Sequence, residues 1–148
     1  VMKKTGIGLI AFLLLIQLYR IDKTNPESAS EKDFMTVVDV PKNIKPIIIN
    51  GCYDCHSNQT VYPWYSNITP INWWLKDHVD DGKKHLNFSV WGDYELKKKD
   101  HKLEEVIEML EEGEMPLKPY TIIHAEAKFT ENQKQQLINW VVELSKSL

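Results

Sequence analysis

The sequence contains only two cysteines, and both lie in one pentapeptide. It has no second Cys/His pair at short spacing, which argues against a four-ligand structural zinc site. It also lacks the strand–helix–strand pattern expected beside a thioredoxin-like dithiol. The formal net charge of −3 is small and no basic aromatic stripe is present, so nucleic acid is not an expected partner. Because no Ser/His/Asp arrangement or carboxylate pair indicates hydrolysis, we do not expect an enzyme.

The pentapeptide itself is Cys52-Tyr53-Asp54-Cys55-His56. Cys-x-x-Cys-His is the attachment signature of c-type haem. Two thiols on one helical turn can each form a thioether to a haem vinyl group, and the histidine that follows becomes the proximal iron ligand. We therefore predict one covalent haem c, attached to Cys52 and Cys55 and ligated by His56.

An apolar run near the N-terminus follows Lys3 and Lys4 and extends from Ile7 to Leu18. This order is typical of a secretory signal. As a helix, residues 5–19 would be about 22 Å long, which is short of the ~20 residues of a usual membrane span. No good cleavage site follows directly. We expect residues 1–21 to be an uncleaved membrane anchor, with a cleaved signal as the alternative.

Either reading places the rest of the chain outside the cytoplasm. It would be held on the periplasmic side of a bacterial inner membrane or, after cleavage, be free in the periplasm. Thioether linkages to haem are made in that location, so the apolar run and the pentapeptide support each other.

Residues 22–33 are polar and indicate a linker, so we expect the domain to be residues 34–148. The pattern of apolar residues predicts an all-α domain preceded by an N-terminal hydrophobic helix. A possible extended segment at Thr36–Val40 is the exception. A covalently held macrocycle would supply apolar surface at the centre of this small domain. The expected helices are 43–52, 70–86, 99–112 and 130–148, the last opening with a capping box at Thr130 and Gln133.

The second axial ligand decides what the iron can do. Met115 lies between a helix stop at Gly113 and Pro116, in a loop stiff enough to hold a weak, neutral thioether near the iron. Met109 falls inside the preceding helix, where a methionine usually fills space in the core. We predict Met115 as the distal ligand.

Histidines are the other candidates for that position. His78 lies on the apolar face of its helix and is the alternative axial group. His85 and His101 have Lys-rich surroundings and are expected to be solvated, and His124 is expected to form a hydrogen bond near the site. Four tryptophans could wall a haem pocket or pack in the core: Trp64, Trp73, Trp74 and Trp91.

Met/His ligation fills the coordination sphere, so the iron can pass electrons but has little room for substrate. We predict a monohaem c-type cytochrome that carries single electrons outside the cytoplasm between redox partner proteins. One alternative is a haem-based sensor or gas-binding module with a labile distal site. Another is a small peroxidase with His78 or His124 as acid–base group.

The order of Cys-x-x-Cys-His, a Met-Pro loop and a C-terminal helix with an aromatic residue resembles class I cytochromes c. More closely, the chain resembles small exported bacterial haem-binding domain proteins. The resemblance implies a cytochrome c-like helical fold with haem on Cys52, Cys55 and His56, and with Met115 on the iron. It rests on these residues: Gln17–Arg20, Asn25-Pro26, Asn50–His56, Pro63–Ser66, Pro70, Gly82, Leu86–Ser89, Trp91, Met115-Pro116, Tyr120, His124-Ala125 and Trp140.

Overall fold

The computed structural model describes residues 2–148. These residues form helices, turns and extended segments, with no strand among them, which confirms the predicted all-α class. The α-helices are α1 (Met2–Ile16), α2 (Phe34–Val37), α3 (Lys45–Gly51), α4 (Tyr53–His56), α5 (Ile71–His85), α6 (Leu96–Glu111), α7 (Lys118–Ile123) and α8 (Glu131–Lys146). The 3₁₀ helices are η1 (Ser30–Lys32), η2 (Trp64–Asn67), η3 (Phe88–Asp93) and η4 (Ala125–Ala127).

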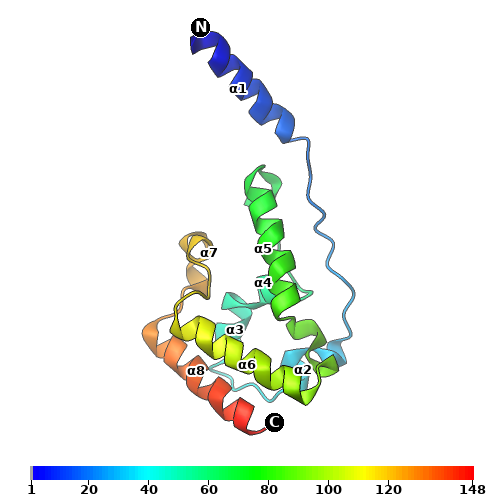
Figure 1. The fold of residues 1–148 in the computed structure, drawn as a ribbon, viewed down its shortest axis with the longest axis vertical. Coiled ribbons are helices and arrows are strands. Elements are labelled where there is room, and N and C mark those ends of the chain that lie inside the picture. The colour runs from blue at the N-terminus through cyan, green and yellow to red at the C-terminus, as the bar shows by residue number, and fades with distance from the viewer. Residues whose placement is uncertain (1) are drawn as a thin grey trace.

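Helix α1 forms where the apolar run predicts a helix, and it projects away from the other helices (Figure 1). Its large apolar side chains from Ile7 to Leu15 are exposed, and Ile16 at its end is half-buried. It has 15 residues. Within residues 2–148, no helix has both the length and the apolar character needed to cross a membrane.

The predicted linker, residues 22–33, runs along one side of the domain and ends in η1 (Figure 1). It makes hydrogen bonds to the domain on its way. Asn25 Nδ2 donates to Thr60 O at 2.9 Å, and the backbone of Glu27 accepts from Asn58 Nδ2 at 3.5 Å.

Most of the apolar core lies where α2, α3, η3, α6 and α8 meet. Helices α6 and α8 pack side by side at the end of the molecule farthest from α1 (Figure 1). Phe34 is at the centre, and its ring makes edge contacts with Trp91 and Trp140 at centroid distances of 5.0 and 6.1 Å. Such aromatic contacts stabilise a core beyond their buried area.

The predicted helix boundaries are close to those observed. The capping box of α8 is confirmed, because Thr130 and Gln133 exchange side-chain and backbone hydrogen bonds. Helix α6 begins three residues earlier than predicted, at Leu96. The extended segment expected at Thr36–Val40 is wrong for Thr36 and Val37, because the Asp33 side chain accepts from Met35 N and caps α2. The chain becomes extended at Val38.

Of the four tryptophans considered for a pocket wall, one belongs to the core. Trp91 is 1% exposed, whereas Trp64, Trp73 and Trp74 are exposed on the surface of η2 and α5. A second, smaller apolar cluster joins these elements to α4. It consists of Tyr65, Leu75 and Val79, with Cys55 and Tyr62 packed against it.

Candidate haem-attachment site

The Cys-x-x-Cys-His motif forms a single helical turn. Helix α3 ends at Gly51, and Cys52 has backbone angles outside the helical region before α4 begins. Backbone hydrogen bonds from Cys55 N and His56 N to Cys52 O, of 3.2 and 2.9 Å, close the turn. The two thiols and the imidazole therefore project from one short, rigid segment, as the spacing predicts.

The orientation of the His56 ring is set by α5 and the residue after it. Its Nδ1 lies 2.9 Å from Gly82 O and 3.1 Å from Leu86 O. Because carbonyl oxygens only accept, Nδ1 carries the hydrogen and the lone pair of the neutral ring is on Nε2. Burial lowers the pKa of His56, although the two carbonyls oppose this effect. The ring is thus held in the tautomer in which Nε2 can bind a metal.

Both cysteines are free thiols and are partly buried. Cys52 packs against the main core, and Cys55 packs against the Tyr65 cluster. Burial raises the pKa of Cys52 to about 12 and that of Cys55 to about 11. The surroundings of both thiols disfavour the charged thiolate. They impose no such cost on the uncharged sulfur of a thioether.

Gly82 allows α5 to approach the motif closely. A Cβ atom at this position would lie 2.8 Å from Cys55 O and 3.3 Å from Cys55 Cβ. Neither contact can be relieved by rotating a flexible side chain. A residue without a Cβ is therefore needed where Gly82 O accepts the hydrogen bond from His56.

A cluster of polar aromatic side chains ties α7 to the motif. Tyr120 OH donates to Asp54 Oδ2 at 2.6 Å, and the Tyr120 ring stacks on His124 at a centroid distance of 4.1 Å. His124 Nδ1 donates to Glu126 Oε1 at 3.1 Å, so its Nε2 accepts from Tyr65 OH at 2.9 Å. As predicted, His124 is a hydrogen-bonded residue, and both of its ring nitrogens have protein partners.

Met115 lies in the loop between α6 and α7. Gly113 adopts a φ of 71° and ends α6, after which Met115 N donates to Met109 O at 3.2 Å. The loop is therefore fixed at its start by α6 and beyond its end by the Tyr120–Asp54 bond. Met109, which belongs to α6, contributes its carbonyl oxygen to the loop.

The other histidines have distinct surroundings. His85 and His101 are exposed and lie near acidic side chains, as expected for solvated residues. The His78 and Trp74 rings are in tilted contact at a centroid distance of 4.1 Å, and His78 Nδ1 donates to Trp74 O at 2.8 Å. This hydrogen bond leaves the lone pair of the neutral His78 ring on Nε2.

Sequence reasoning missed a buried polar network next to the motif. The Asp33 carboxylate accepts from Tyr53 OH at 2.8 Å, Gln59 Nε2 at 2.9 Å and Ser89 Oγ at 3.3 Å. Ser89 Oγ in turn accepts from Asn58 N. The network joins α2, α4, η3 and the chain after His56. The only feature of the sequence that could have indicated this network is Asp33, an aspartate directly before the apolar residue Phe34.

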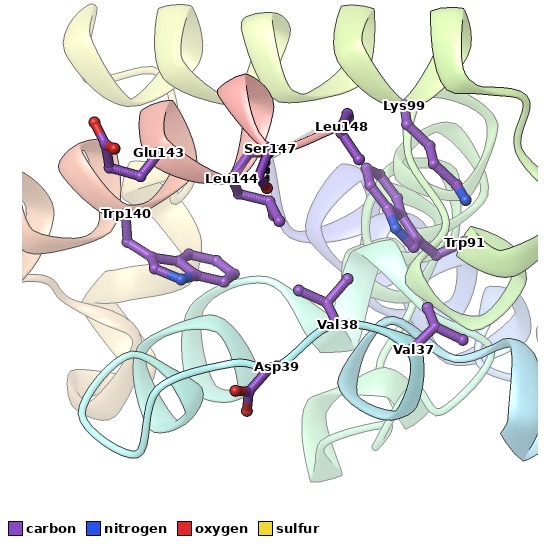
Figure 2. Close-up of a pocket in the computed structure, with 10 residues that line it drawn as sticks. All are labelled: Val37, Val38, Asp39, Trp91, Lys99, Trp140, Glu143, Leu144, Ser147 and Leu148. Carbon is purple, nitrogen blue, oxygen red and sulfur yellow. Dashed lines mark hydrogen bonds between the residues drawn. The ribbon is translucent and has the colours of Figure 1, made fainter.

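A cavity in the described part of the chain lies away from the motif. It measures about 450 Å³ and lies between the segment after α2 and the end of α8, with the side chains of Trp140 and Val38 around it (Figure 2). Trp91 lines this cavity, but the predicted haem-attachment and iron-ligand residues Cys52, Cys55, His56 and Met115 do not.

The residues at the motif fit a haem group. Two uncharged thiols and a free Nε2 supply the linkages, and large apolar side chains nearby can contact a macrocycle. Val61 is 74% exposed, Trp64 is 72% exposed and Ile122 in α7 is 82% exposed. Val61 N donates to Asp54, and Trp64 contacts Tyr65 edge-on, so both belong to the surroundings of the motif.

Comparison with known families agrees with this reading. The family described as a haem-binding domain matches residues 11–143, which is most of the chain. No curated protein and no solved structure matches it. The match includes the motif, Gly82, the Met115 loop and His124, and it begins within α1. The chain belongs to the haem-binding domain family.

Proposed function

We propose that this protein is a monohaem c-type cytochrome that carries single electrons outside the cytoplasm. The observation that carries the proposal is the placement of His56. It follows the two cysteines on one turn, and its Nδ1 is bonded to backbone carbonyls, which leaves Nε2 for iron. A redox dithiol would not require an oriented histidine, and a structural zinc site would require a fourth ligand beside the two cysteines and His56.

In this proposal Cys52 and Cys55 hold the haem covalently and His56 ligates the iron. When bound, haem supplies a one-electron ferric/ferrous couple. Gly82 O and Leu86 O polarise the imidazole through Nδ1–H and increase its donor strength, which favours the ferric state. Burial of the motif favours the ferrous state instead, because ferric haem carries one more positive charge and burial disfavours that charge.

Met115 is the proposed distal ligand. The fixed loop supports this role, since a weak thioether ligand depends on a scaffold that holds it in place. His78 is the competing ligand, because its own helix orients the ring and leaves Nε2 available. His124 is a poorer candidate as ligand or peroxidase acid–base group, since Tyr65 and Glu126 engage both of its nitrogens.

We also propose that the protein acts on the outer side of a bacterial cytoplasmic membrane, attached through α1. Thioether attachment takes place outside the cytoplasm, and α1 exposes apolar side chains along its length. Redox proteins would then exchange electrons with it there.

The optical spectrum of the oxidised protein tests the ligation. Met115 on the iron gives a sulfur-to-iron charge-transfer band, which Met115→Leu should abolish while keeping the volume of the side chain. The matched control Met109→Leu should retain the band. If the wild-type protein lacks the band and His78→Leu changes the spectrum, His78 is the ligand. If neither variant changes it and carbon monoxide binds readily, the sensor alternative replaces electron transfer.

A further inference from the structure

Helix α1 is held to the domain by hydrogen bonds as well as by the chain. Gln17 follows α1 directly, and its amide pairs with the backbone of Thr69. Gln17 Nε2 donates to Thr69 O at 2.8 Å, and Thr69 N donates to Gln17 Oε1 at 2.9 Å. This two-bond pairing, just before α5 begins, fixes the point at which α1 meets the domain.

The residues after Gln17 extend this attachment. The Tyr19 and Trp73 rings meet edge-on at a centroid distance of 5.8 Å. Arg20 Nη1 donates to Asn67 O at 2.8 Å, and Lys23 Nζ donates to Asn67 Oδ1 at 2.6 Å. Helix α1 consequently leaves the domain at the end where α5 begins (Figure 1).

The surface around this attachment is apolar and exposed. Ile68, Ile71 and Trp73 belong to the domain, and Leu18 and Tyr19 follow α1. We call these five residues the aromatic end. Their exposed fractions are Leu18 80%, Tyr19 58%, Ile71 44%, Trp73 44% and Ile68 38%. The aromatic end adjoins α1, so one apolar surface continues from the helix onto the domain.

We propose that the aromatic end of the domain lies in the headgroup region of a lipid bilayer into which α1 inserts. The proposal rests on the membrane attachment through α1 proposed above, and it is independent of electron transfer. Its occupant is a lipid surface rather than a protein, because the aromatic end is continuous with a helix that exposes large apolar side chains from Ile7 to Leu15.

The length of α1 gives a physical reason why the aromatic end would lie in the headgroup region. A helix of 15 residues is about 22 Å long, shorter than a hydrocarbon layer of about 30 Å. A short apolar helix draws its flanking residues toward the bilayer. Here those residues are Leu18 and Tyr19, and Trp73 follows because its ring contacts Tyr19.

The residue types of the aromatic end also suit the headgroup region. Trp and Tyr are enriched at membrane interfaces, where one part of the ring is apolar and the other is hydrated. Arg20 and Lys23 each use one donor on Asn67 and keep others for lipid phosphates. On α5, Gly82 lies about 14 Å beyond Trp73. The haem motif would therefore be carried at a constant position relative to the bilayer.

Fluorine NMR of the haem-loaded full chain tests the proposal. The protein is labelled with 5-fluorotryptophan and placed in phosphatidylcholine nanodiscs that contain a lipid with a headgroup nitroxide. Single Trp→Phe variants assign the resonances. We expect the Trp73 signal to be lost to paramagnetic broadening, whereas that of Trp140 in α8, at the far end of the molecule, keeps its width (Figure 1).

Gln17→Ala should restore the Trp73 signal, because α1 stays in the bilayer while the domain is released. Gln135→Ala, on the exposed side of α8, should change nothing. An unbroadened Trp73 signal in the wild-type protein, or equal broadening of Trp73 and Trp140, would overturn the proposal. Failure of the chain to associate with nanodiscs would overturn the membrane attachment as well. Failure of the proposed Met115 ligation would instead appear in the optical spectrum, as loss of the sulfur-to-iron charge-transfer band.

Discussion

Gly82→Ala is the substitution that most directly probes how α5 holds the haem motif. The added Cβ would lie 2.8 Å from Cys55 O and 3.3 Å from Cys55 C. Both are backbone atoms of a short turn, so α5 and α4 must move apart by several tenths of an ångström. Overpacking of this kind costs about 1–3 kcal/mol.

A helix-interior glycine also has an intrinsic cost, which alanine removes. That gain is about 0.8–1.0 kcal/mol. The net expectation is a loss of about 1 kcal/mol in the free energy of unfolding. Separation of α5 from α4 should also lengthen the bond from His56 Nδ1 to Gly82 O. A less polarised imidazole stabilises ferric iron less, so the midpoint potential should rise.

Urea unfolding of the haem-loaded protein, followed by far-UV circular dichroism, measures the first effect, and redox titration measures the second. The matched control is Asp77→Ala, an exposed position of the same helix, which should be neutral or slightly stabilising. If Gly82→Ala were about 1 kcal/mol more stable than wild type, Gly82 would be an ordinary helix glycine. An unchanged potential would refute the proposed link from Gly82 to His56.

Two further substitutions test the polar contacts around the motif. Tyr120→Phe removes the 2.6 Å bond to Asp54 that ties α7 to α4, and should lower the free energy of unfolding by about 2 kcal/mol. Tyr62→Phe should leave that free energy unchanged, and an equal loss in both variants would show that the bond to Asp54 is not responsible. Asp33→Asn leaves buried donors unpaired and should cost about 3 kcal/mol in thermal or urea unfolding. The exposed control Asp39→Asn should be neutral, and a neutral Asp33→Asn would mean that the buried network contributes nothing to stability.

The parts of the fold that could be predicted are those with a repeated local signal. Helices α5, α6 and α8 each contain several turns of apolar periodicity. Pro70 marks the start of α5, Gly113 the end of α6 and a capping box the start of α8. Helix α7 has six residues and is too short to show a period. Helix α2 depends on one cap, Asp33, whose side chain also accepts hydrogen bonds from α4, from η3 and from the chain after His56.

The candidate site also has a part that the sequence predicts and a part that it does not. The two cysteines and His56 are adjacent in the chain, so their spacing alone predicts the attachment chemistry. Their supporting contacts come from far away in sequence: Gly82 O is 26 residues from His56, and Tyr120 is 66 residues from Asp54. Any residue can supply a backbone carbonyl, so no sequence pattern could identify the partner of His56.

Extraction of the purified protein with acidified acetone tests covalent haem attachment most directly. The pigment should stay with the precipitated polypeptide, and the intact mass should exceed that of the bare chain by one haem. The variant with both Cys52→Ala and Cys55→Ala should release its pigment into the solvent. Release of the pigment from the wild-type protein would contradict thioether attachment at Cys52 and Cys55, and with it the proposed c-type cytochrome.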